Sequence, residues 1–336
     1  MNAGSTSLKL HVVAPDGEAE PVDSLEAAAG RVGAVVHRVV HGGRRFRQPV
    51  LIDAEVRREI FELEAIAPLH NAPALRGIEQ AERVFPELPQ VAVFDTGFHA
   101  TIPDEASAYA LPRRWREEWD VHRYGFHGLS VRWAAEQVRV PRLAVCHLGG
   151  GSSVTAVLDG RSVDTTMGFS PLEGVPMATR AGSVDPGALV YLLREHGLGV
   201  EELDHALNFE SGLKGLAGGS GDMRELVDRA ATGEAEAVLA LDVYLHRLAA
   251  AVAAMAAATD GIDALAFTAG IGEGSVAVRA GLCARLGFLG VELDAARNEA
   301  CEPDCDVATD GSRVRVHVIR AREELVAARA ARQVLG

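Results

Sequence analysis

The feature that most constrains this chain is a run of three glycines between two strand-like stretches. Residues 143–147 are apolar, residues 149–151 are all glycine, and residues 153–158 return to an apolar, β-branched pattern. This order predicts a β-hairpin whose turn presents consecutive backbone N–H groups, which together form a binding site for an anion. Hydroxyl groups beside the turn would add further donors, namely those of Ser152, Ser153 and Thr155.

A similar turn opens the chain. Residues 2–9 (NAGSTSLK) form a Gly/Ser-rich turn that leads into an alternating strand at residues 8–13. Either turn alone is more simply explained as a plain connection between strands. Because one occurs in each half, the pair predicts two related α/β lobes that present N–H groups to a shared phosphate.

The remaining pattern alternates strands with helices, which predicts the α/β class, and 336 residues suit two domains. Further strands are predicted at residues 31–40, 91–94, 265–267 and 314–319. Helices are predicted at residues 53–66, 74–85, 186–196, 222–231, 234–258 and 323–334. The longest apolar run, residues 248–258, is well short of the ~20 residues that span a bilayer, and its alanines favour a buried or interface helix.

Composition excludes several classes of partner. The chain carries 47 acidic and 33 basic residues, a net charge of −14, so we expect no nucleic-acid partner and no membrane partner. The P-loop pattern GxxxxGK followed by Ser or Thr does not occur, and GIGEGS at residues 270–275 does not match GxGxxG. Of the four cysteines only Cys301 and Cys305 are close, and CEPDC lacks His or further Cys partners, so a metal site there is disfavoured. We expect reduced cysteines and a cytoplasmic location.

Four polar side chains stand at predicted strand ends or in tight turns, where active sites collect. They are Arg38 in HRVVHGG, Asp95 in VFDTGFH, His127 in RYGFHG, and Arg180 in the Pro/Gly-rich segment 170–187. Spacing alone favours plain structural roles for each: a surface ion pair, a helix cap, a core histidine and a loop cation, in that order.

The motifs taken together resemble the acetate kinase family in order and approximate spacing, from about residue 31 to residue 330. The motifs are NAGSTSLK (2–9), HRVVHGG (37–43), IAPLHNAPAL (66–75), VFDTGFH (93–99), RYGFHG (123–128), HLGGGSSVTA (147–156), VDTTMGFSPLEGVPMATRAG (163–182), SGDMREL (220–226), FTAGIGEG (267–274) and REELVAAR (322–329). The family belongs to the acetate and sugar kinase, heat-shock cognate and actin superfamily. This resemblance implies two ribonuclease-H-like lobes with the active site in the cleft between them.

The resemblance also implies roles for individual residues. Arg38 and Arg180 match two active-site arginines, and planar guanidinium groups suit carboxylate and phosphoryl oxygens. His127 matches the histidine that stabilises the phosphoryl group during transfer. Asp95 and Glu323 match carboxylates associated with Mg²⁺, and the metal site would comprise Asn2 and Glu323.

Substrate and nucleotide sites follow from the same resemblance. The acceptor pocket would comprise Arg38, Val40, Leu69, Phe126 and Pro171. ATP or ADP would contact Asn2, Ser5, Ser7, Lys9, His147, Gly149, Gly150, Gly151, Asp222, Met223, Arg224, Gly270, Ile271 and Gly272. Mg²⁺ is the implied ion, with Mn²⁺ as the alternative.

The chain departs from the family at its N-terminal end. Met1 directly precedes Asn2, where family members have a strand, and the segment between NAGSTSLK and HRVVHGG is short. We therefore expect a reduced N-terminal lobe at residues 1–140, whose last helix packs elsewhere. The nucleotide-binding and dimerisation lobe is expected at 141–336, with helix 323–334 returning to the first lobe. A start site placed too far downstream would explain the shortening, and the intact mass of the native protein would test it. Gly150 and Gly274 stand where the family commonly has Asn, as does Arg322.

The implied activity is an acetate kinase, with reversible, in-line, Mg²⁺-dependent transfer from ATP to acetate, in a homodimer. A propionate or butyrate kinase is the first alternative, because one methylene in a pocket discriminates by only ~1–3 kcal/mol. A catalytically impaired, actin-like nucleotide-binding protein is the second, because the first lobe is short. Reaction direction in the cell and nucleotide preference stay open.

Overall fold

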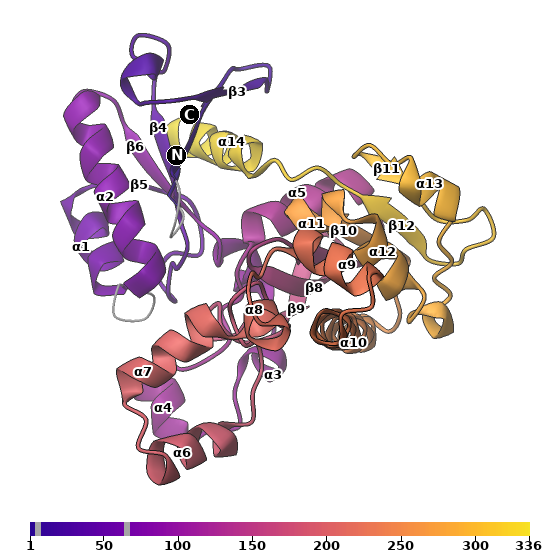
Figure 1. Ribbon diagram of the computed structural model, residues 1–336. Coiled ribbons are helices and arrows are strands. Elements are labelled where there is room, and N and C mark those ends of the chain that lie inside the picture. Colours follow the sequence, from indigo (N-terminus) through magenta and orange to yellow (C-terminus); the bar gives the residue numbers. More distant parts are fainter. Residues whose placement is uncertain (4–7, 64–67) are drawn as a thin grey trace.

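The computed structural model describes residues 1–3, 8–63 and 68–336, and within these residues the chain forms two six-stranded sheets (Figure 1). The first sheet has the order β3-β2-β1-β4-β6-β5, built from β1 (Asn2–Ala3), β2 (Leu8–Val13), β3 (Ala19–Val22), β4 (Val35–Val39), β5 (Val50–Leu51) and β6 (Gln90–Phe94). The second has the order β11-β12-β10-β7-β8-β9, built from β7 (Arg142–Leu148), β8 (Ser152–Leu158), β9 (Arg161–Thr165), β10 (Ala264–Thr268), β11 (Cys305–Asp306) and β12 (Arg315–Val318). The predicted α/β class with two lobes is confirmed.

Strand register in the first sheet aligns polar residues that are distant in sequence. β1 pairs antiparallel with β2 and parallel with β4, so that Asn2 lies beside both Lys9 and Arg38. β4 pairs parallel with β6, whose end leads directly to Asp95. Helices α1 (Ala54–Glu62) and α2 (Pro68–Val84) pack together, and α2 also contacts β4. The carboxyl ends of β4 and β6 therefore meet at one edge, facing the second lobe.

The second sheet is covered on both faces, because alternate residues of its central strands point to opposite sides. Cys146 and Phe267 face one core, which includes α10 (Ala235–Ala258). Val145 and Ala266 face the other core, which includes α5 (Gly128–Val138). The remaining helices around this lobe are α8 (Gly212–Ala217), α9 (Met223–Ala231), α11 (Ala269–Gly274), α12 (Val276–Cys283) and α13 (Ala295–Glu299).

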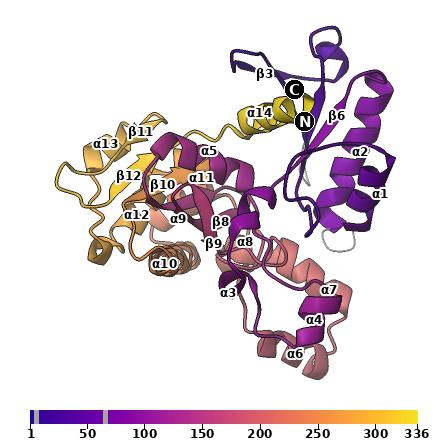
Figure 2. The same ribbon diagram turned by 180° about the vertical axis from the view of Figure 1, so that it is seen from behind.

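Short helices form a projection below the second sheet (Figure 2). They are α3 (Asp104–Ser107), α4 (Arg113–Glu118), α6 (Pro186–Glu195) and α7 (Val200–His205), followed by a π-helical turn at Ala206–Glu210. The segment 166–185 contains neither helix nor strand, as its Pro/Gly content predicts. Three 3₁₀ turns complete the described structure, at Glu26–Ala28, Gly97–Thr101 and Gly287–Leu289.

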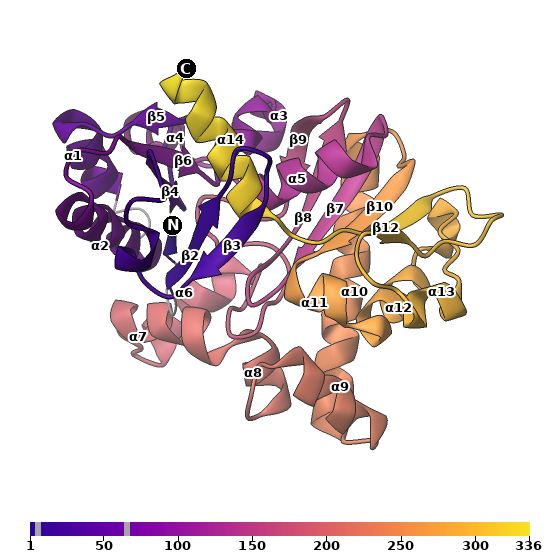
Figure 3. The same cartoon turned by 90° about the horizontal axis from the view of Figure 1, so that it is seen from above.

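The C-terminal helix crosses between the lobes. After β12 the chain runs back to the first sheet, where α14 (Glu323–Leu335) packs against β4, β6 and α5 (Figures 1 and 3). Arg329 of α14 also pairs with Glu136 of α5 at 2.5 Å. Because α14 begins at Glu323, the crossing carries this carboxylate into the space between the two sheets.

Helix α10 contains the apolar run noted in the sequence. By length and composition α10 could cross a membrane, but the core helix of a soluble protein passes the same test, so this is weak support for a membrane span. α10 contacts α8, α9, α12 and β8, and Tyr244 and Leu248 on it are fully buried. It is the central helix of the core that contains Cys146 and Phe267.

The reduced state expected for all four cysteines is wrong for two of them. Cys301 and Cys305 form a disulfide with a Cα–Cα distance of 6.3 Å. That separation lies within the range a disulfide can bridge, and the local fold around β11 brings the two residues together. Cys146 and Cys283 are free thiols and are buried.

Candidate active site

A cleft of about 720 Å³ lies between the two sheets and is lined from both lobes. Nine residues singled out in the sequence line it: Asn2, Lys9, Arg38, His127, His147, Gly149, Gly150, Gly270 and Glu323. They come from β1, β2, β4 and β7, from the residue before α5, from the glycine turn after β7, from α11, and from the first residue of α14. The cleft therefore gathers residues that span almost the whole chain.

Arg38 is the centre of the charged group in this cleft. Its Nε lies 2.8 Å from Asp95 Oδ1, and its Nη2 donates to Asp95 Oδ2, which makes the contact bidentate. Its Nη1 donates to Asn2 Oδ1 at 2.9 Å. Glu323 Oε2 lies 3.7 Å from Arg38 Nε and accepts a hydrogen bond from Asn2 Nδ2 at 3.1 Å. Two carboxylates thus share one guanidinium.

The charges of this group shift the acidities of its members. Burial alone would lower the pKa of Arg38, but the charges of Asp95 and Glu323 raise it above its ordinary value. Burial alone would raise the pKa of Glu323, but Arg38 and other cations lower it below its ordinary value. Burial raises the pKa of Asp95, although Arg38 opposes this. The lowered pKa of Glu323 keeps its carboxylate ionised, so the cluster offers oxygen ligands to a cation.

His127 precedes α5 and adopts a left-handed backbone conformation with φ of 62°. Its ring stacks on the ring of His147 with centroids 3.9 Å apart, and its Nδ1 lies 3.0 Å from Ser153 Oγ. Burial, with the nearby His147, Arg38 and Arg180, lowers the pKa of His127 well below 6.5. The imidazole is therefore neutral at neutral pH and can donate a hydrogen bond without carrying charge.

His147 stands near the end of β7, where it lines the cleft. Its Nδ1 lies 2.8 Å from the Ser130 hydroxyl, which fixes the orientation of the ring. Burial lowers the pKa of His147 to about 4. Sequence reasoning did not single out Ser130; its place in RYGFHGLS, three residues after His127, was the only available signal.

The glycine turn between β7 and β8 closes through a hydrogen bond from Gly149 N–H to the Gly151 carbonyl, at 2.9 Å. A Cβ at Gly151 would lie 3.2 Å from His127 Nε2 and 3.6 Å from Arg180 Nη1, so the turn borders both side chains. A Cβ at Gly150 would meet nothing within 4 Å, so this backbone is open. The turn therefore places backbone without side chains beside the guanidinium of Arg180 and the imidazole of His127.

The expectation that neighbouring hydroxyls also face the phosphate is wrong. Ser152, Ser153 and Thr155 are fully buried. Ser152 contacts the Tyr244 hydroxyl, Ser153 holds His127, and Thr155 contacts Thr165. The alternation of β8 in a sheet covered on both faces leaves none of these side chains at the cleft.

Arg180 reaches the turn from the irregular segment 166–185. Its backbone carbonyl accepts from Met177 N–H at 3.1 Å, and burial lowers the pKa of its side chain. Arg123 holds the start of this segment, because its Nη1 donates to the carbonyls of residues 165–167 and its Nη2 to Glu173. Sequence reasoning did not find this role for Arg123, although it stands in RYGFHG.

Three residues of the predicted acceptor pocket are buried apolar residues. Val40 and Phe126 are buried together with Tyr124, Met167 and Met177. Pro171 is also buried. Leu69 belongs to the first turn of α2, but its side chain is outside the described part of the structure, and Ser5 and Ser7 lie outside the described residues.

The residues predicted to contact adenosine are only partly brought to the cleft. Gly270 lines the cleft, whereas Ile271 and Gly272 pack toward the core that contains Phe267 and α10. Met223 is buried in that core, so its side chain is not offered to a ligand. Asp222 caps α9 by accepting from Arg224 N–H, and the Arg224 guanidinium pairs with Asp222 at 2.9 Å. Sequence spacing did not predict that these side chains serve the helix itself.

A metal ion would have to be held by few protein ligands. Within residues 1–3, 8–63 and 68–336, no group of three or more His, Cys, Asp or Glu side chains could hold a metal ion. Mg²⁺ commonly takes one or two carboxylates with waters and substrate phosphates, so such a group is not required. Glu323 and Asn2 line the cleft with oxygen atoms, and they fit an ion of this kind. Both oxygens of Asp95 are engaged by Arg38, which makes Asp95 a weaker ligand.

Two further carboxylates, missed in the sequence, line the cleft, namely those of Glu273 and Glu324. Glu273 of α11 accepts a hydrogen bond from the Ala321 backbone N–H at 2.9 Å. This contact joins the second lobe to the segment just before Glu323. The signal was the position of Glu273 in FTAGIGEG, directly after a buried strand.

Comparisons with known proteins identify the family of this chain. The profile of the acetokinase family matches residues 19–329. The acetate kinase of Nostoc punctiforme is 46% identical over 328 residues, which cover 95% of this chain and 80% of that protein. The acetate kinase of a Synechococcus strain is 48% identical over 320 residues, covering 93% of this chain and 79% of the relative.

Solved structures show the same architecture. A propionate kinase from Francisella tularensis superposes with a TM-score of 0.91 at 34% identity, covering 98% of this chain and 97% of the other. An acetate kinase from Porphyromonas gingivalis superposes with a TM-score of 0.86 at 33% identity, covering 98% and 90%. Fold and site define a phosphotransferase of the actin-like ATPase fold, with a carboxyl group as the acceptor. The chain belongs to the acetokinase family.

Proposed function

We propose that this chain transfers a phosphoryl group reversibly between ATP and acetate, forming ADP and acetyl phosphate. The observation that supports this most is that Arg180 and His127 lie beside a bare glycine turn, with Arg38 lining the same cleft. These groups suit a reaction that asks the protein mainly for positioning and charge stabilisation. The relatives named acetate kinase, at 46% and 48% identity, support acetate as the acceptor.

The chemistry balances without a protein base. An acetate oxygen, already ionised, attacks the γ-phosphorus, and the bond to the oxygen that bridges the β- and γ-phosphates breaks toward ADP. In this proposal the N–H groups around Gly150 hold phosphate oxygens, and Arg180 and Arg38 orient the acceptor and the transferring group. Neutral His127 donates to a phosphoryl oxygen as charge moves along the line of transfer.

We further propose Mg²⁺ as the ion, held by Glu323 and Asn2. When bound, the ion supplies positive charge that offsets the charge of the phosphate oxygens. Asp95 then acts by fixing Arg38 through its bidentate contact. The depressed pKa of Glu323 keeps its carboxylate available for the ion at neutral pH.

A small acceptor fits the buried apolar group best. Val40 and Phe126 belong to a buried apolar cluster with Tyr124, Met167 and Met177, which suits a short apolar group such as a methyl. Propionate or butyrate is the alternative acceptor, supported by the similarity to a protein described as a propionate kinase.

The wider organisation is also proposed. Residues 1–140 would form the shortened first lobe and residues 141–336 the second, with helix 323–334 belonging spatially to the first. A homodimer through the second lobe is supported by exposed apolar side chains there, including Tyr191 at 55% and Leu239 at 55% exposure. A cytoplasmic location suits an enzyme that consumes ATP. Light scattering and cell fractionation would test these two points.

The activity is tested by trapping acyl phosphates as hydroxamates across formate, acetate, propionate and butyrate. We expect the highest kcat/KM with acetate and a dependence on Mg²⁺. Arg180→Ala should lower kcat by about 10³-fold with the fold retained, whereas Arg45→Gln, a surface control, should not change it. A higher kcat/KM for propionate would overturn acetate as the acceptor, and ATP binding without turnover of any acid would overturn the enzyme itself.

A further inference from the structure

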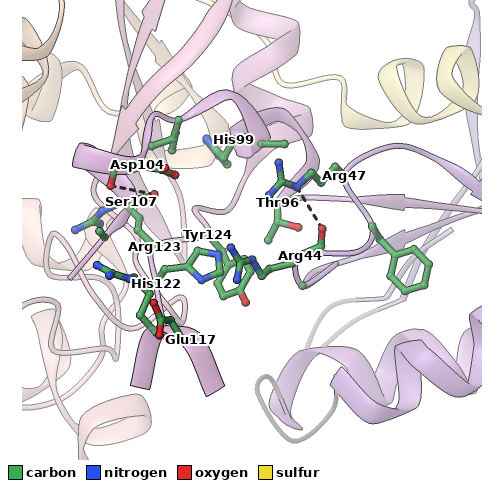
Figure 4. Close-up of a pocket in the computed structure, with 16 residues that line it drawn as sticks. Arg44, Arg47, Thr96, His99, Asp104, Ser107, Glu117, His122, Arg123 and Tyr124 are labelled. Carbon is green, nitrogen blue, oxygen red and sulfur yellow. Dashed lines mark hydrogen bonds between the residues drawn. The ribbon is translucent and has the colours of Figure 1, made fainter. Parts of the chain in front are cut away.

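A second cavity, of about 460 Å³, lies away from the transfer cleft and shares no lining residue with it. One wall is the loop after β4, which contains Arg44 and Arg47. The opposite wall is the segment that contains α3, α4 and the stretch before His127 (Figure 4). The cavity therefore lies where the first lobe meets the projection below the second sheet.

The cavity wall carries more positive than negative charge. Four arginines line it, against two carboxylates: Arg44, Arg47, Arg116 and Arg123, with Asp104 and Glu117. This local excess of arginine contrasts with the net charge of −14 of the whole chain. Glu117 is already paired, because its Oε1 accepts from Arg113 Nε at 2.6 Å.

Two of the four arginines are occupied by the protein. Arg44 pairs with Asp120 at 3.0 Å, and Arg123 pairs with Glu173 at 3.0 Å while it binds three backbone carbonyls. Their charges are therefore partly neutralised by carboxylates beside the cavity. These two arginines shape the walls.

The other two keep their binding capacity. Arg47 donates only its Nε, to the Arg44 carbonyl at 3.2 Å (Figure 4). Across residues 1–3, 8–63 and 68–336, no carboxylate oxygen lies within 4.0 Å of the guanidinium of Arg47 or Arg116. Both guanidinium groups can therefore donate hydrogen bonds to an oxygen-rich anion.

The side of the cavity near Tyr124 adds a polar aromatic surface. His122 lies against Tyr124 with ring centroids 4.0 Å apart, and Figure 4 shows both rings between Arg44 and Glu117. Burial lowers the pKa of His122, and the charges of Arg44 and Arg47 lower it further, although Asp120 opposes them. The field of these arginines thus extends into the cavity.

We propose that this cavity binds a compact dianion with oxygen acceptors, held between Arg47 and Arg116 at a site separate from the transfer cleft. A phosphate group and a dicarboxylate share this chemistry, and planar guanidinium groups suit both. The volume lies within the ~300–1,000 Å³ usual for small-molecule sites, so it admits a small organic anion as well as phosphate.

The test is isothermal titration of the full chain with inorganic phosphate and, separately, with succinate, at constant ionic strength. Three variants are compared with the wild type. The double variant Arg47→Gln/Arg116→Gln removes the proposed ligands. Arg180→Ala removes a cleft cation. Arg45→Gln is the matched control, since Arg45 belongs to the same loop but does not line the cavity and pairs with Glu55 and Glu59.

We expect saturable binding of at least one probe that weakens by ~10-fold or more in the double variant and stays within ~2-fold in both single variants. Circular dichroism would show that each variant is folded. Binding of phosphate alone or of succinate alone identifies the class of anion. The proposal is overturned if neither probe binds the wild type, if the double variant binds equally well, or if Arg180→Ala abolishes binding, which would place the anion in the cleft.

Discussion

At the scale of single residues, Arg38 organises the charged half of the cleft. Its guanidinium contacts Asp95 and Asn2 directly, and Glu323 lies 3.7 Å away. These contacts use most of its donors in one plane, which a point charge cannot reproduce. Loss of the planar group should therefore disturb three partners together.

We predict that Arg38→Lys lowers kcat for acetyl phosphate formation by roughly 10²–10³-fold. Lysine keeps the charge but loses the bidentate contact with Asp95, so both the acceptor and the carboxylates would be misplaced. Steady-state kinetics measure the effect, and Arg45→Gln is the surface control. A lysine variant with wild-type kcat would show that the guanidinium geometry is not used.

His127 gives a second prediction at this scale. Its pKa is lowered well below 6.5, so protonation cannot remove activity near neutral pH. We predict that the plot of log kcat/KM against pH shows no ionisation of His127 between pH 6 and 8. The variant His127→Gln should lower kcat/KM by the same factor at every pH in this range. An acid limb near pH 6.5 that disappears in the variant would contradict a neutral imidazole.

At the scale of elements, the start of α5 is tightly held against the end of β6. Gly128, the first residue of α5, donates its N–H to the Asp95 carbonyl at 3.0 Å. A Cβ at this position would lie 2.1 Å from that carbonyl oxygen and 2.9 Å from Phe98 Cβ. Only glycine permits this approach, which places His127 beside Asp95.

We predict that Gly128→Ala lowers the free energy of unfolding by about 2–4 kcal/mol, because the backbone must shift away from Asp95. Urea unfolding measures the change. Gly33→Ala is the control, since its Cβ would meet nothing within 4 Å. Equal stability of the two variants would mean that the helix start tolerates a side chain.

At the scale of the whole molecule, the two lobes bury several neutral histidines. Burial lowers the pKa values of His37, His99 and His147 to about 4 each. In the unfolded chain these groups titrate near 6.5, so between pH 6.5 and 4 the unfolded state binds more protons than the folded state. Stability must therefore fall as the pH falls through this window.

We predict that the free energy of unfolding falls by roughly 1 kcal/mol per buried histidine between pH 6.5 and 5.5, or about 3 kcal/mol for these three. Urea unfolding across this range measures the slope. The variant His37→Gln should show a shallower slope than the wild type. Constant stability down to pH 5 would contradict the burial of neutral imidazoles.

Local patterns explain how much of the fold was predictable. The strand at residues 8–13 matches β2 exactly in extent, and the helix predicted at 323–334 is α14, one residue longer. The strand predicted at 31–40 shortens to Val35–Val39, because only that stretch pairs with neighbours. α5 was expected only as a last helix of the first lobe that packs elsewhere, without bounds, because RYGFHGLS was interpreted as a turn; it contacts β7 and β10 of the second sheet.

The sequence by itself determined the α/β class, the glycine turn at residues 149–151 and the polar residues at strand ends, because periodicity and turn chemistry act over a few residues. Tertiary structure decided which of them meet. Asn2, Arg38 and Glu323 converge through strand register and the crossing of α14, which no local pattern encodes. The Ser153 hydroxyl, predicted to donate to a phosphate, instead contacts His127 in the tertiary structure, because buried polar groups are hydrogen-bonded within the protein. The arginine-lined cavity likewise exists only where two distant segments face each other.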